Sequence, residues 1–413
     1  MAGLARQDGE LACDGISLSD IVRKESTPLY VYSAARVREA HAAFSGAFAS
    51  YPHTLHYALK ANSTLAMVRL LRALGCEADA NSGGELDVAL RAGFVPSEVV
   101  FTGVGKTHAE LERAVALGVK AINIESEGEA HRIDAIARDR GVRARVAVRV
   151  NPDIDPHSHP HISTGLRLNK FGVPIEQVPA LFRSMSGCPG LEPVGLHTHL
   201  GSQIFDMGPL AQVARALADL ASEVRASGAH LQHLDLGGGL GVAYDGSPAP
   251  EPSAYAAAVL PVGRETGLHL LLEPGRFLVA PAGVLVGRVT DRKSYPGSPD
   301  FVVLDTGMTE LIRPALYGAY HRIEAVRPRV GPSRVYEIVG PLCETSDTLG
   351  HERRLGPIEV GDLLAIRDTG AYGAVMASNY NRRMMPAEVL VENGVWRVIR
   401  RRQTIDDLIA LEE

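Results

Sequence analysis

Lys60 is the residue whose place in this sequence most directly suggests covalent chemistry. It ends a short apolar run in "LHYALKANS" (55–63), and polar residues follow it at once. A lysine amine can bond covalently to the carbonyl group of a substrate or cofactor. A solvated surface lysine is the simpler interpretation, and Lys106 follows an apolar run as well. The residues alone therefore leave both lysines as candidates for carrying a covalently bound cofactor.

Three consecutive glycines in "LDLGGGLG" (234–241) are suited to holding a phosphate. Adjacent glycines expose backbone N–H groups that bind anions. The segment also resembles a dinucleotide fingerprint, but its glycines are consecutive and a loop, "VAYDGSPAPEP", follows them. A single phosphate therefore fits better than the pyrophosphate of a dehydrogenase cofactor. A tight turn without a ligand remains the other interpretation.

Glu273 follows an apolar run in "LLLEPGR" (270–276), so it is expected to be buried. A buried carboxylate costs several kcal/mol unless a cation or a donor compensates it. Arg276 is one possible partner, and the cationic ring nitrogen of a cofactor is the other. With a lysine, a phosphate loop, His199 of "HTHLGSQ" to stack on the ring and Ser202 near the phosphate, this carboxylate would complete the set of groups that pyridoxal phosphate requires.

The polar residues of interest end apolar runs that alternate with helical segments rich in Ala, Leu and Glu. This alternation predicts parallel strands and β/α units, and about eight of them between residues 28 and 277 favour a (β/α)8 barrel of the TIM type. The runs start at "LYVYS" (29–33) and "LHYAL" (55–59) and finish with "LHLLLEPGR" (268–276). The carboxyl ends of barrel strands converge on one mouth. We expect these strand-end residues there: Lys60, Asp79, Asn81, Ser82, Lys106, Asn151, His197, His199, Asp235, Gly237, Gly238, Gly239, Glu273 and Arg276.

The pattern changes after residue 277. Segments such as "DFVVLDTG" and "AEVLVENGVWRVI" are β-rich and are separated by Gly, Pro and Asp turns. They predict a mostly antiparallel β domain over residues 278–413. We expect a strand from residues 1–27 to complete this domain.

Composition excludes several classes of function. The 42 basic and 48 acidic residues give a net charge of −6, which argues against a nucleic-acid partner. No run approaches the ~18 apolar residues of a membrane span. The start, "MAGLARQDGE", lacks the apolar stretch of a secretion signal, so we do not expect secretion. The four cysteines lack metal-finger spacing, so we expect free thiols, no metal site and a cytoplasmic location.

Ten segments together resemble one family. They include "YALKAN", "SGGEL", "NPDIDPHSHPHISTGLRLNKFG", "HTHLGSQI", "LDLGGGLG", "EPGRFLVA", "GMTELIRPALYGAYH", "GPLCETSD", "DLLAIRDTGAYG" and "SNYNRR". In this order and spacing, the sequence resembles the diaminopimelate decarboxylase family, whose members are pyridoxal-phosphate decarboxylases with the alanine-racemase fold. The resemblance implies a homodimer with shared active sites. It also implies decarboxylation of meso-2,6-diaminopimelate to L-lysine and CO2, the last step of lysine biosynthesis.

The resemblance also assigns roles to residues. It marks Lys60 as the lysine that forms the Schiff base, His199 as the side chain facing the cofactor ring, and Cys343 as the proton donor. The implied cofactor-binding residues are Lys60, Asp79, His199, Ser202, Gly238, Gly239, Glu273, Gly275, Arg276 and Tyr372. The implied substrate-binding residues are Arg276, Arg313, Tyr317, Glu344 and Tyr372, with Glu344 acting from the other subunit. Glu273 would pair with the ring nitrogen.

The distal end of the substrate separates this activity from related ones. Diaminopimelate carries an ammonium and a carboxylate there, so its pocket needs both an anion and a cation, whereas ornithine needs only the anion. Arg276 and Arg313 would supply the cation and Glu344 the anion that a diaminopimelate pocket needs. The alternative for Arg313 is a structural ion pair. The alternatives are a decarboxylase for carboxynorspermidine, ornithine or arginine, an alanine-racemase-like enzyme, or a non-catalytic homologue. The family's usual "CESGD" is "CETSD" (343–347) here, which leaves the effect of the lost glycine open.

Overall fold

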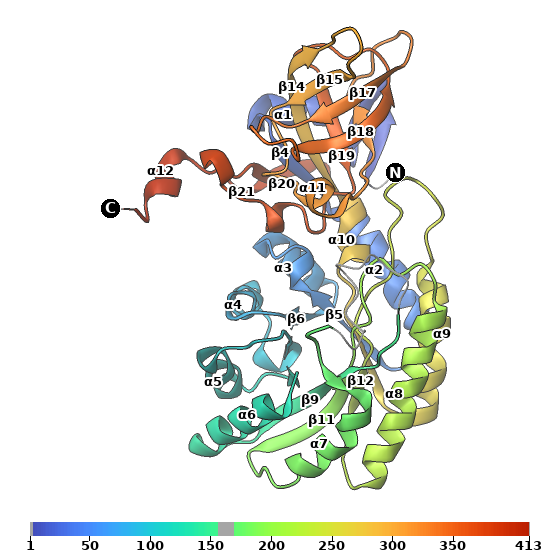
Figure 1. The fold of residues 1–413 in the computed structure, drawn as a ribbon, viewed down its shortest axis with the longest axis vertical. Helices are drawn as coiled ribbons and strands as arrows, with labels where there is room; N and C mark the ends of the chain where they lie inside the picture. Colours follow the sequence, from blue (N-terminus) through green and yellow to red (C-terminus); the bar gives the residue numbers. More distant parts are fainter. Residues whose placement is uncertain (1–2, 156–168, 413) are drawn as a thin grey trace. The chain divides into compact units, whose positions relative to one another are not determined.

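The structure is a computed structural model that describes residues 3–155 and 169–412. The chain forms two compact units (Figure 1). The barrel unit comprises His41–Val242 and Ala249–Gly275, and the β unit comprises Met1–Ala40, Ala243–Pro248 and Arg276–Glu413. Residues 156–168 of the motif "NPDIDPHSHPHISTGLRLNKFG" lie outside the described residues.

The barrel unit is built on a closed parallel sheet. Among the described residues, eight strands pair in sequence around the barrel, and the last pairs with the first, Leu270 lying opposite His53. The strands are β5 (His53–Ala58), β6 (Glu77–Ala80), β7 (Val99–Phe101), β8 (Ala121–Ile124), β9 (Ala144–Asn151), β11 (Leu191–His197), β12 (His233–Asp235) and β13 (His269–Leu272). A short strand, β10 (Val173–Pro174), adds to β9. The predicted TIM-type barrel is confirmed.

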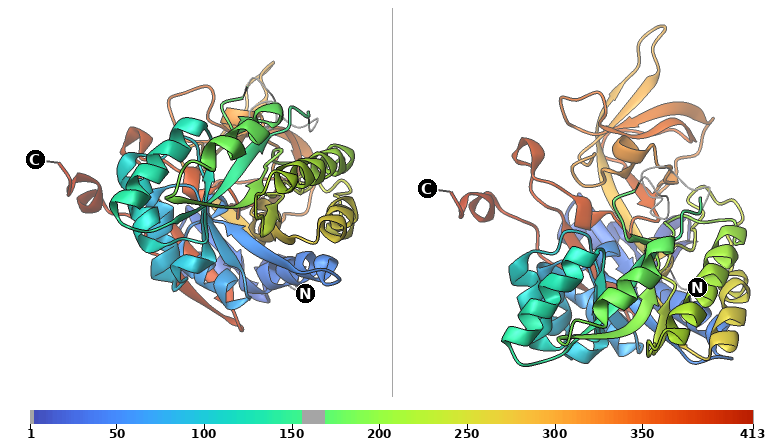
Figure 2. Two further views of the ribbon diagram at one scale, coloured as in Figure 1. Left: turned by 90° about the horizontal axis from the view of Figure 1, so that it is seen from below. Right: turned by 60° about the horizontal axis from the view of Figure 1, so that its bottom comes forward.

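Helices surround these strands, as the left view of Figure 2 shows. They are α2 (Ala34–Phe48), whose first residues belong to the β unit, α3 (Leu65–Ala73), α4 (Gly83–Ala92), α5 (His108–Leu117), α6 (Glu127–Asp139), α7 (Val178–Met185), α8 (Gly208–Ala226) and α9 (Pro252–Thr266). Hydroxyl N-caps start three of them: Ser82, Thr107 and Ser126 each accept a hydrogen bond from the third helical residue. Because each cap lies shortly after a strand, the strand-end residues are held between a sheet and a helix start.

One predicted barrel strand belongs elsewhere. "LYVYS" forms β4 (Leu29–Ser33), which pairs antiparallel with β14 (Gly283–Lys293) and parallel with β20 (Ala387–Glu392) in the β unit. All residues of β4 are buried, because it is a central strand. Its apolar sequence therefore resembles that of a parallel barrel strand. The barrel strand missing from the prediction is β6. Its Glu77 and Asp79 are acidic, so β6 lacks the apolar run by which the other strands were predicted. The units therefore divide after residue 40 rather than at residue 28.

The β unit contains a large, mostly antiparallel sheet. Its order is β18-β17-β15-β14-β4-β20-β21, and β19 pairs with β14 and β16. The strands not yet bounded are β15 (Asp300–Leu304), β16 (Ile323–Ala325), β17 (Arg334–Val339), β18 (Thr348–Leu355), β19 (Leu363–Arg367) and β21 (Val395–Arg400). The short helices α10 (Arg276–Val279), α11 (Arg313–Tyr317) and α12 (Ile405–Ile409) connect or follow them. The prediction of a mostly antiparallel β domain after the barrel is confirmed.

The N-terminal segment forms a small sheet of its own. Strands β1 (Leu4–Gln7), β2 (Glu10–Cys13) and β3 (Ile16–Ser17) pair with one another, and α1 (Leu18–Glu25) follows. The segment does not supply the strand that was expected to complete the large sheet; β4 does. It contributes to the same core instead, because Leu11 and Cys13 pack with Val284 and Val389.

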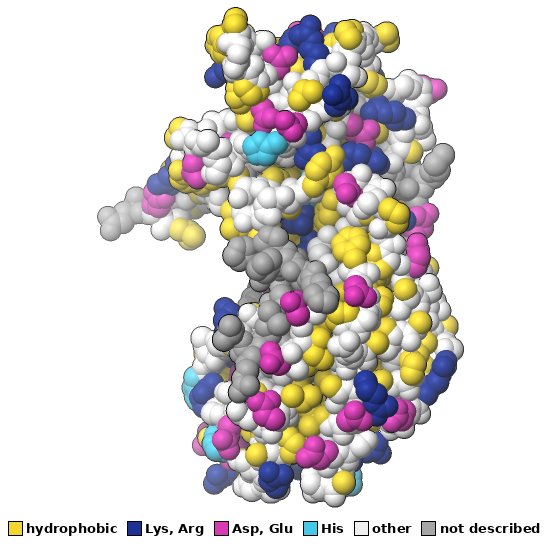
Figure 3. All heavy atoms as spheres, turned by 45° about the vertical axis from the view of Figure 1, so that its right-hand side comes forward, with side chains coloured by type: hydrophobic (Ala, Val, Ile, Leu, Met, Phe, Trp, Pro, Cys, Tyr) yellow, Lys and Arg dark blue, Asp and Glu magenta, His cyan; other side chains and the backbone are white. Residues whose placement is uncertain are grey.

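The surface carries both signs of charge. On the face shown in Figure 3, Lys and Arg side chains are interspersed with Asp and Glu side chains. In the part of the chain that the structure describes, no helix has both the length and the apolar character needed to cross a membrane.

Candidate active site

Lys60 stands at the carboxyl end of β5, on a single 3-10 turn (Leu59–Ala61). Its Nζ atom lies 3.5 Å from Asp79 Oδ2 and 3.4 Å from Asn81 Oδ1. Asp79 is fully buried in β6, while the Lys60 side chain is 33% exposed. The Asn81 amide also donates a hydrogen bond to Asp79, at 2.9 Å, which fixes that carboxylate beside the amine. The result is an accessible amine held at the mouth of the barrel by a buried acid.

Lys106, the competing lysine, is enclosed. Its side chain is only 2% exposed. It donates to the Asn123 carbonyl at 2.7 Å and to Glu129 Oε1 at 3.1 Å. Burial lowers the pKa of Lys106, and the Glu129 carboxylate opposes this shift. The side chain therefore serves as one half of a buried ion pair, which leaves Lys60 as the reachable amine of the two.

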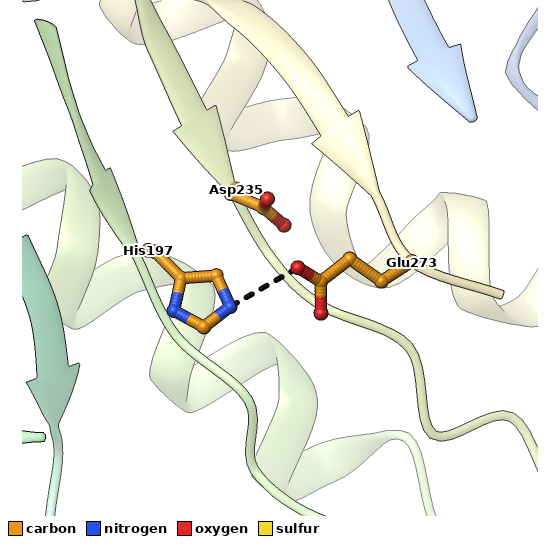
Figure 4. A group of neighbouring side chains, drawn as sticks. All are labelled: His197, Asp235 and Glu273. Atoms are coloured by element: carbon orange, nitrogen blue, oxygen red, sulfur yellow. Dashed lines mark ion pairs between the residues drawn. The ribbon is translucent and has the colours of Figure 1, made fainter. Parts of the chain in front are cut away.

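Three buried side chains converge at the ends of β11, β12 and β13 (Figure 4). They are His197, Asp235 and Glu273, and one polar atom of each lies within 4.8 Å of the others. His197 Nε2 is 3.3 Å from Glu273 Oε1. His197 and Asp235 were expected at the barrel mouth because each ends an apolar run, but the sequence assigns neither of them a role.

The two carboxylates in this group are not equivalent. At such a separation, two ionised carboxylates would repel by roughly 3 kcal/mol at an effective dielectric constant of about 20. Burial, and then repulsion from Glu273, raises the pKa of Asp235 well above its usual value. Burial alone would raise the pKa of Glu273 too, but His197 and Lys60 outweigh it and hold that pKa below its usual value. Glu273 is thus the ionised member of the pair.

The glycine loop after β12 packs tightly against its neighbours. A Cβ atom on Gly238 would lie 2.2 Å from the Glu273 carbonyl oxygen, so only glycine fits there. The Gly238 N–H donates to His199 Nδ1 at 3.3 Å. The neutral His199 ring therefore carries its proton on Nε2. Burial, and then the charge of Lys60, lowers the pKa of His199 to about 3, so the ring is neutral near pH 7.

Neighbouring segments bring Ser202 and Gly275 to the same end of the barrel. The loop with Ser202 is tied to the glycine loop, because Ile204 N–H donates to the Gly239 carbonyl at 2.9 Å. A Cβ atom on Gly275 would come within 3.1 Å of the Ala58 and Ala61 side chains, which flank Lys60. Both residues thus belong to the group at the barrel mouth.

These features fit pyridoxal phosphate. Glu273 is buried, and its pKa is held below the usual value by His197 and Lys60, which suits an acid that faces a ring nitrogen. A neutral imidazole, an accessible amine and a backbone loop that tolerates no side chain at Gly238 meet the other needs of the cofactor.

A second group of predicted residues lies in the β unit. Arg276 Nη1 donates to the Tyr244 hydroxyl at 2.9 Å, and its guanidinium lies 4.6 Å from the centre of the Tyr372 ring. The Arg313 guanidinium lies 4.6 Å from the centre of the Tyr244 ring. Both arginines are buried. Tyr244 was missed from sequence, because it lies in a loop far from either arginine along the chain.

Arg313 has neutral partners. His321 Nδ1 lies 2.8 Å from the Arg367 carbonyl, which can only accept, so Nε2 is free to accept from Arg313 Nη1 at 2.6 Å. Burial, and then the Arg313 charge, lowers the pKa of His321 to about 3. Within the described residues, Arg313 forms no ion pair and its Nε has no hydrogen-bond partner. The structural ion pair considered for Arg313 is therefore absent from this part of the chain, and a buried cation is left to meet an anion.

The loop with Cys343 and Glu344 follows β17. The Cys343 thiol is exposed and lies 3.6 Å from Asn381 Nδ2. Buried Asp347 anchors the loop, because its two oxygens accept from the Met308 N–H at 2.6 Å and the Leu342 N–H at 2.8 Å.

The departure from the family's "CESGD" is accommodated in this loop. Ser346, where the family has glycine, lacks a positive φ and donates to Glu344 Oε1 at 2.6 Å. The serine therefore needs no left-handed backbone, and it adds a bond to the predicted substrate residue.

The predicted residues thus fall into two sets. The barrel unit brings together Lys60, Asp79, His199, Ser202, Gly238, Gly239, Glu273 and Gly275. The β unit holds Arg276, Arg313, Tyr317, Cys343, Glu344 and Tyr372.

Comparison with known proteins identifies relatives across the chain. Residues 34–280 match the family model described as "Pyridoxal-dependent decarboxylase, pyridoxal binding domain". The chain is 44% identical over 408 residues to the diaminopimelate decarboxylase of Vibrio cholerae, which covers 98% of this chain and 97% of that protein.

Solved structures give the same result. The diaminopimelate decarboxylase of Helicobacter pylori, complexed with L-lysine, matches with a TM-score of 0.92 at 38% identity, covering 95% of this chain and 98% of that chain. The lysine/ornithine decarboxylase of Vibrio vulnificus matches with a TM-score of 0.80 at 24% identity, covering 92% and 98%. The second likeness shows the fold alone.

We expect borohydride reduction of the protein loaded with pyridoxal phosphate to attach the label to Lys60. The Lys60 side chain is accessible, whereas Lys106 is buried and forms an ion pair with Glu129. Peptide mapping by mass spectrometry would locate the label. The Lys60→Arg variant, which keeps the charge beside Asp79, should take none. A label on Lys106, or on the arginine variant, would contradict this assignment.

Proposed function

The chain belongs to the diaminopimelate decarboxylases, a family of pyridoxal-dependent decarboxylases, and on that premise we propose that it converts meso-2,6-diaminopimelate to L-lysine and CO2. This is the last step of lysine biosynthesis. The observation that carries the proposal is Arg313, a buried cation whose partners in the described residues are neutral. A substrate with a carboxylate at its distal end would supply the missing anion.

The barrel residues would hold the cofactor. Lys60 offers the amine for covalent attachment, Asp79 and Asn81 orient that amine, and Glu273 offers a negative charge for the ring nitrogen. Neutral His199 would cover the ring. The backbone of Gly238 and Gly239, with Ser202, Gly275, Arg276 and Tyr372, would surround the phosphate. When bound, pyridoxal phosphate supplies an electron sink for the bond that releases CO2.

The residues of the β unit would orient the substrate. A guanidinium binds a carboxylate through two parallel hydrogen bonds, which fixes its direction as well as its position. Arg313 and Arg276 would bind substrate carboxylates in this way, with Tyr317 and Tyr372 beside them, and Glu344 would take the distal ammonium. A site built for a distal carboxylate disfavours ornithine, because its arginine would be left without a partner. Glu273 disfavours racemase-like chemistry, in which an arginine faces the ring nitrogen.

Cys343 would return the proton. Its exposed thiol can donate to the carbon that has lost CO2. Asp347 holds the loop that carries this thiol by binding two backbone N–H groups. We propose that Cys343 and Glu344 complete the site of a second subunit in a homodimer. The free cysteines are consistent with a cytoplasmic enzyme.

Incubation of the purified protein with pyridoxal phosphate and meso-diaminopimelate should yield CO2 and lysine in equal amounts. Lys60→Ala should reduce this rate by at least about 10³-fold, because the covalent attachment point is lost. Ornithine, arginine and carboxynorspermidine serve as competing substrates in the same assay. Decarboxylation of one of these substrates faster than that of diaminopimelate would favour the related decarboxylases, and no product from any of them would favour a non-catalytic homologue.

Arg313→Ala should raise KM for diaminopimelate by roughly 100-fold, the cost of losing a bidentate charge-assisted pair. The absorbance of the bound cofactor should change little. Arg329→Ala provides the matched control, because Arg329 already pairs with Asp362 at 2.8 Å on the surface. Equal losses of substrate and cofactor binding in Arg313→Ala would show that the residue supports the fold instead.

Mixing two inactive variants tests the shared site. Suppose that Cys343 completes the site of the other subunit. A heterodimer of one Lys60→Ala chain and one Cys343→Ala chain then has one site in which both Lys60 and Cys343 are native. Statistical exchange of subunits should then restore about one quarter of the wild-type rate. Each variant alone should remain inactive. A mixture no more active than its components would argue for sites contained within one chain.

A further inference from the structure

The carboxyl groups of Asp235 and Glu273 face each other in a buried part of the barrel unit (Figure 4). Asp235 is fully buried, and Glu273 is 3% exposed. In the described part of the chain, Asp235 Oδ2 lacks a hydrogen-bond partner, and the neighbour of Glu273 Oε1 is His197 Nε2 at 3.3 Å. Two acceptor oxygens that face each other satisfy one another only when one of them carries a proton. The two acids lie within 4.8 Å of each other and are buried, which favours one shared proton over two negative charges.

The surroundings decide which residue keeps that proton. Glu273 is faced by His197 of β11 at 3.3 Å and by the positive charge of Lys60 after β5. Asp235 is faced by two acids, Glu273 and Asp79 of β6. Its only fixed donor in the described residues is the Gly237 N–H, at 2.9 Å from Oδ1. The negative charge is therefore more stable on Glu273, and the proton on Asp235.

We propose that Asp235 is a positioning residue: it stays protonated, donates its proton to Glu273, and so presents Glu273 to the cofactor as a single fixed negative charge. His197 Nε2 steadies the same carboxylate from the other side. The role rests on the proposed function only in that Glu273 must face the ring nitrogen. Were the proton on Glu273 instead, the ring nitrogen would meet a neutral acid and would not be held cationic.

The proton itself is measurable in the protein without cofactor. Infrared difference spectra of wild type against Asp235→Asn, at pH 7 to 8, should show the carbonyl stretch of one protonated carboxylic acid in the wild type. Asp219→Asn, which changes an exposed acid on α8, should show no such band in its own difference spectrum. The absence of the band from the wild-type minus Asp235→Asn spectrum would overturn the proposal.

The pH dependence of the free energy of unfolding provides a second test, and the proposal predicts its direction. The raised pKa means that folded Asp235 holds a proton that the unfolded chain releases. The wild type should therefore lose stability relative to Asp235→Asn as pH rises from 5 towards 8, by up to tenfold per pH unit in the unfolding equilibrium constant. Urea denaturation of the cofactor-free proteins would measure this. A difference independent of pH would contradict a proton held by Asp235.

Cofactor affinity tests the positioning role. Asp235→Asn keeps a donor towards Glu273 and should bind pyridoxal phosphate within about threefold of wild type. Asp235→Ala removes the donor and should bind at least about tenfold more weakly. Its kcat should fall while KM for the substrate stays constant. Equal affinity and kcat in both variants would overturn the role. Normal cofactor binding without lysine formation would instead count against the proposed function alone.

Discussion

The barrel mouth is organised around one constraint: a carboxylate, Glu273, must remain ionised in a site that excludes water. Burial works against this charge, so the surrounding residues offset it. Lys60 and His197 lie close enough to favour the ionised form, while Asp235 takes the neutral form. The chemistry of a pyridinium ring depends on that balance, because only an ionised acid keeps the ring nitrogen protonated.

The β unit contains buried positive charges, and neutral neighbouring groups stabilise them. Arg276 and Arg313 are buried cations, and their contacts include the rings of Tyr372 and Tyr244, which interact with cations without neutralising them. His321 accepts from Arg313 while remaining uncharged. The positive charge of Arg313 is therefore not neutralised by an acid in the part of the chain that the structure describes, which supports its proposed role toward a substrate carboxylate. The barrel unit thus holds a buried negative charge and the β unit holds buried positive charges; the proposed function assigns the first to the cofactor ring and the second to the substrate.

Much of this arrangement was predictable from sequence, and the errors have a physical cause. The alternation of apolar runs and helices predicted the barrel, because a strand covered by helices on its outer face must be apolar throughout. The same rule misassigned β4, since a central strand of an antiparallel sheet that is covered on both faces looks identical. The sequence did not predict β6, because Glu77 and Asp79 occupy positions where an apolar run was expected; Glu77 pairs with His56 and Asp79 with Lys60.

The sequence by itself determined the barrel, the β domain, the family and the candidate lysine, because these depend on local periodicity and on motifs in a fixed order. Tertiary structure alone decided which buried groups are charged. Lys106 and Lys60 end similar runs and each pairs with an acid, yet the Lys106 side chain is buried while that of Lys60 is partly exposed. Asp235 and Glu273 both follow strands, yet only one holds a proton. Ionisation depends on neighbours distant along the chain, and those are set by the fold.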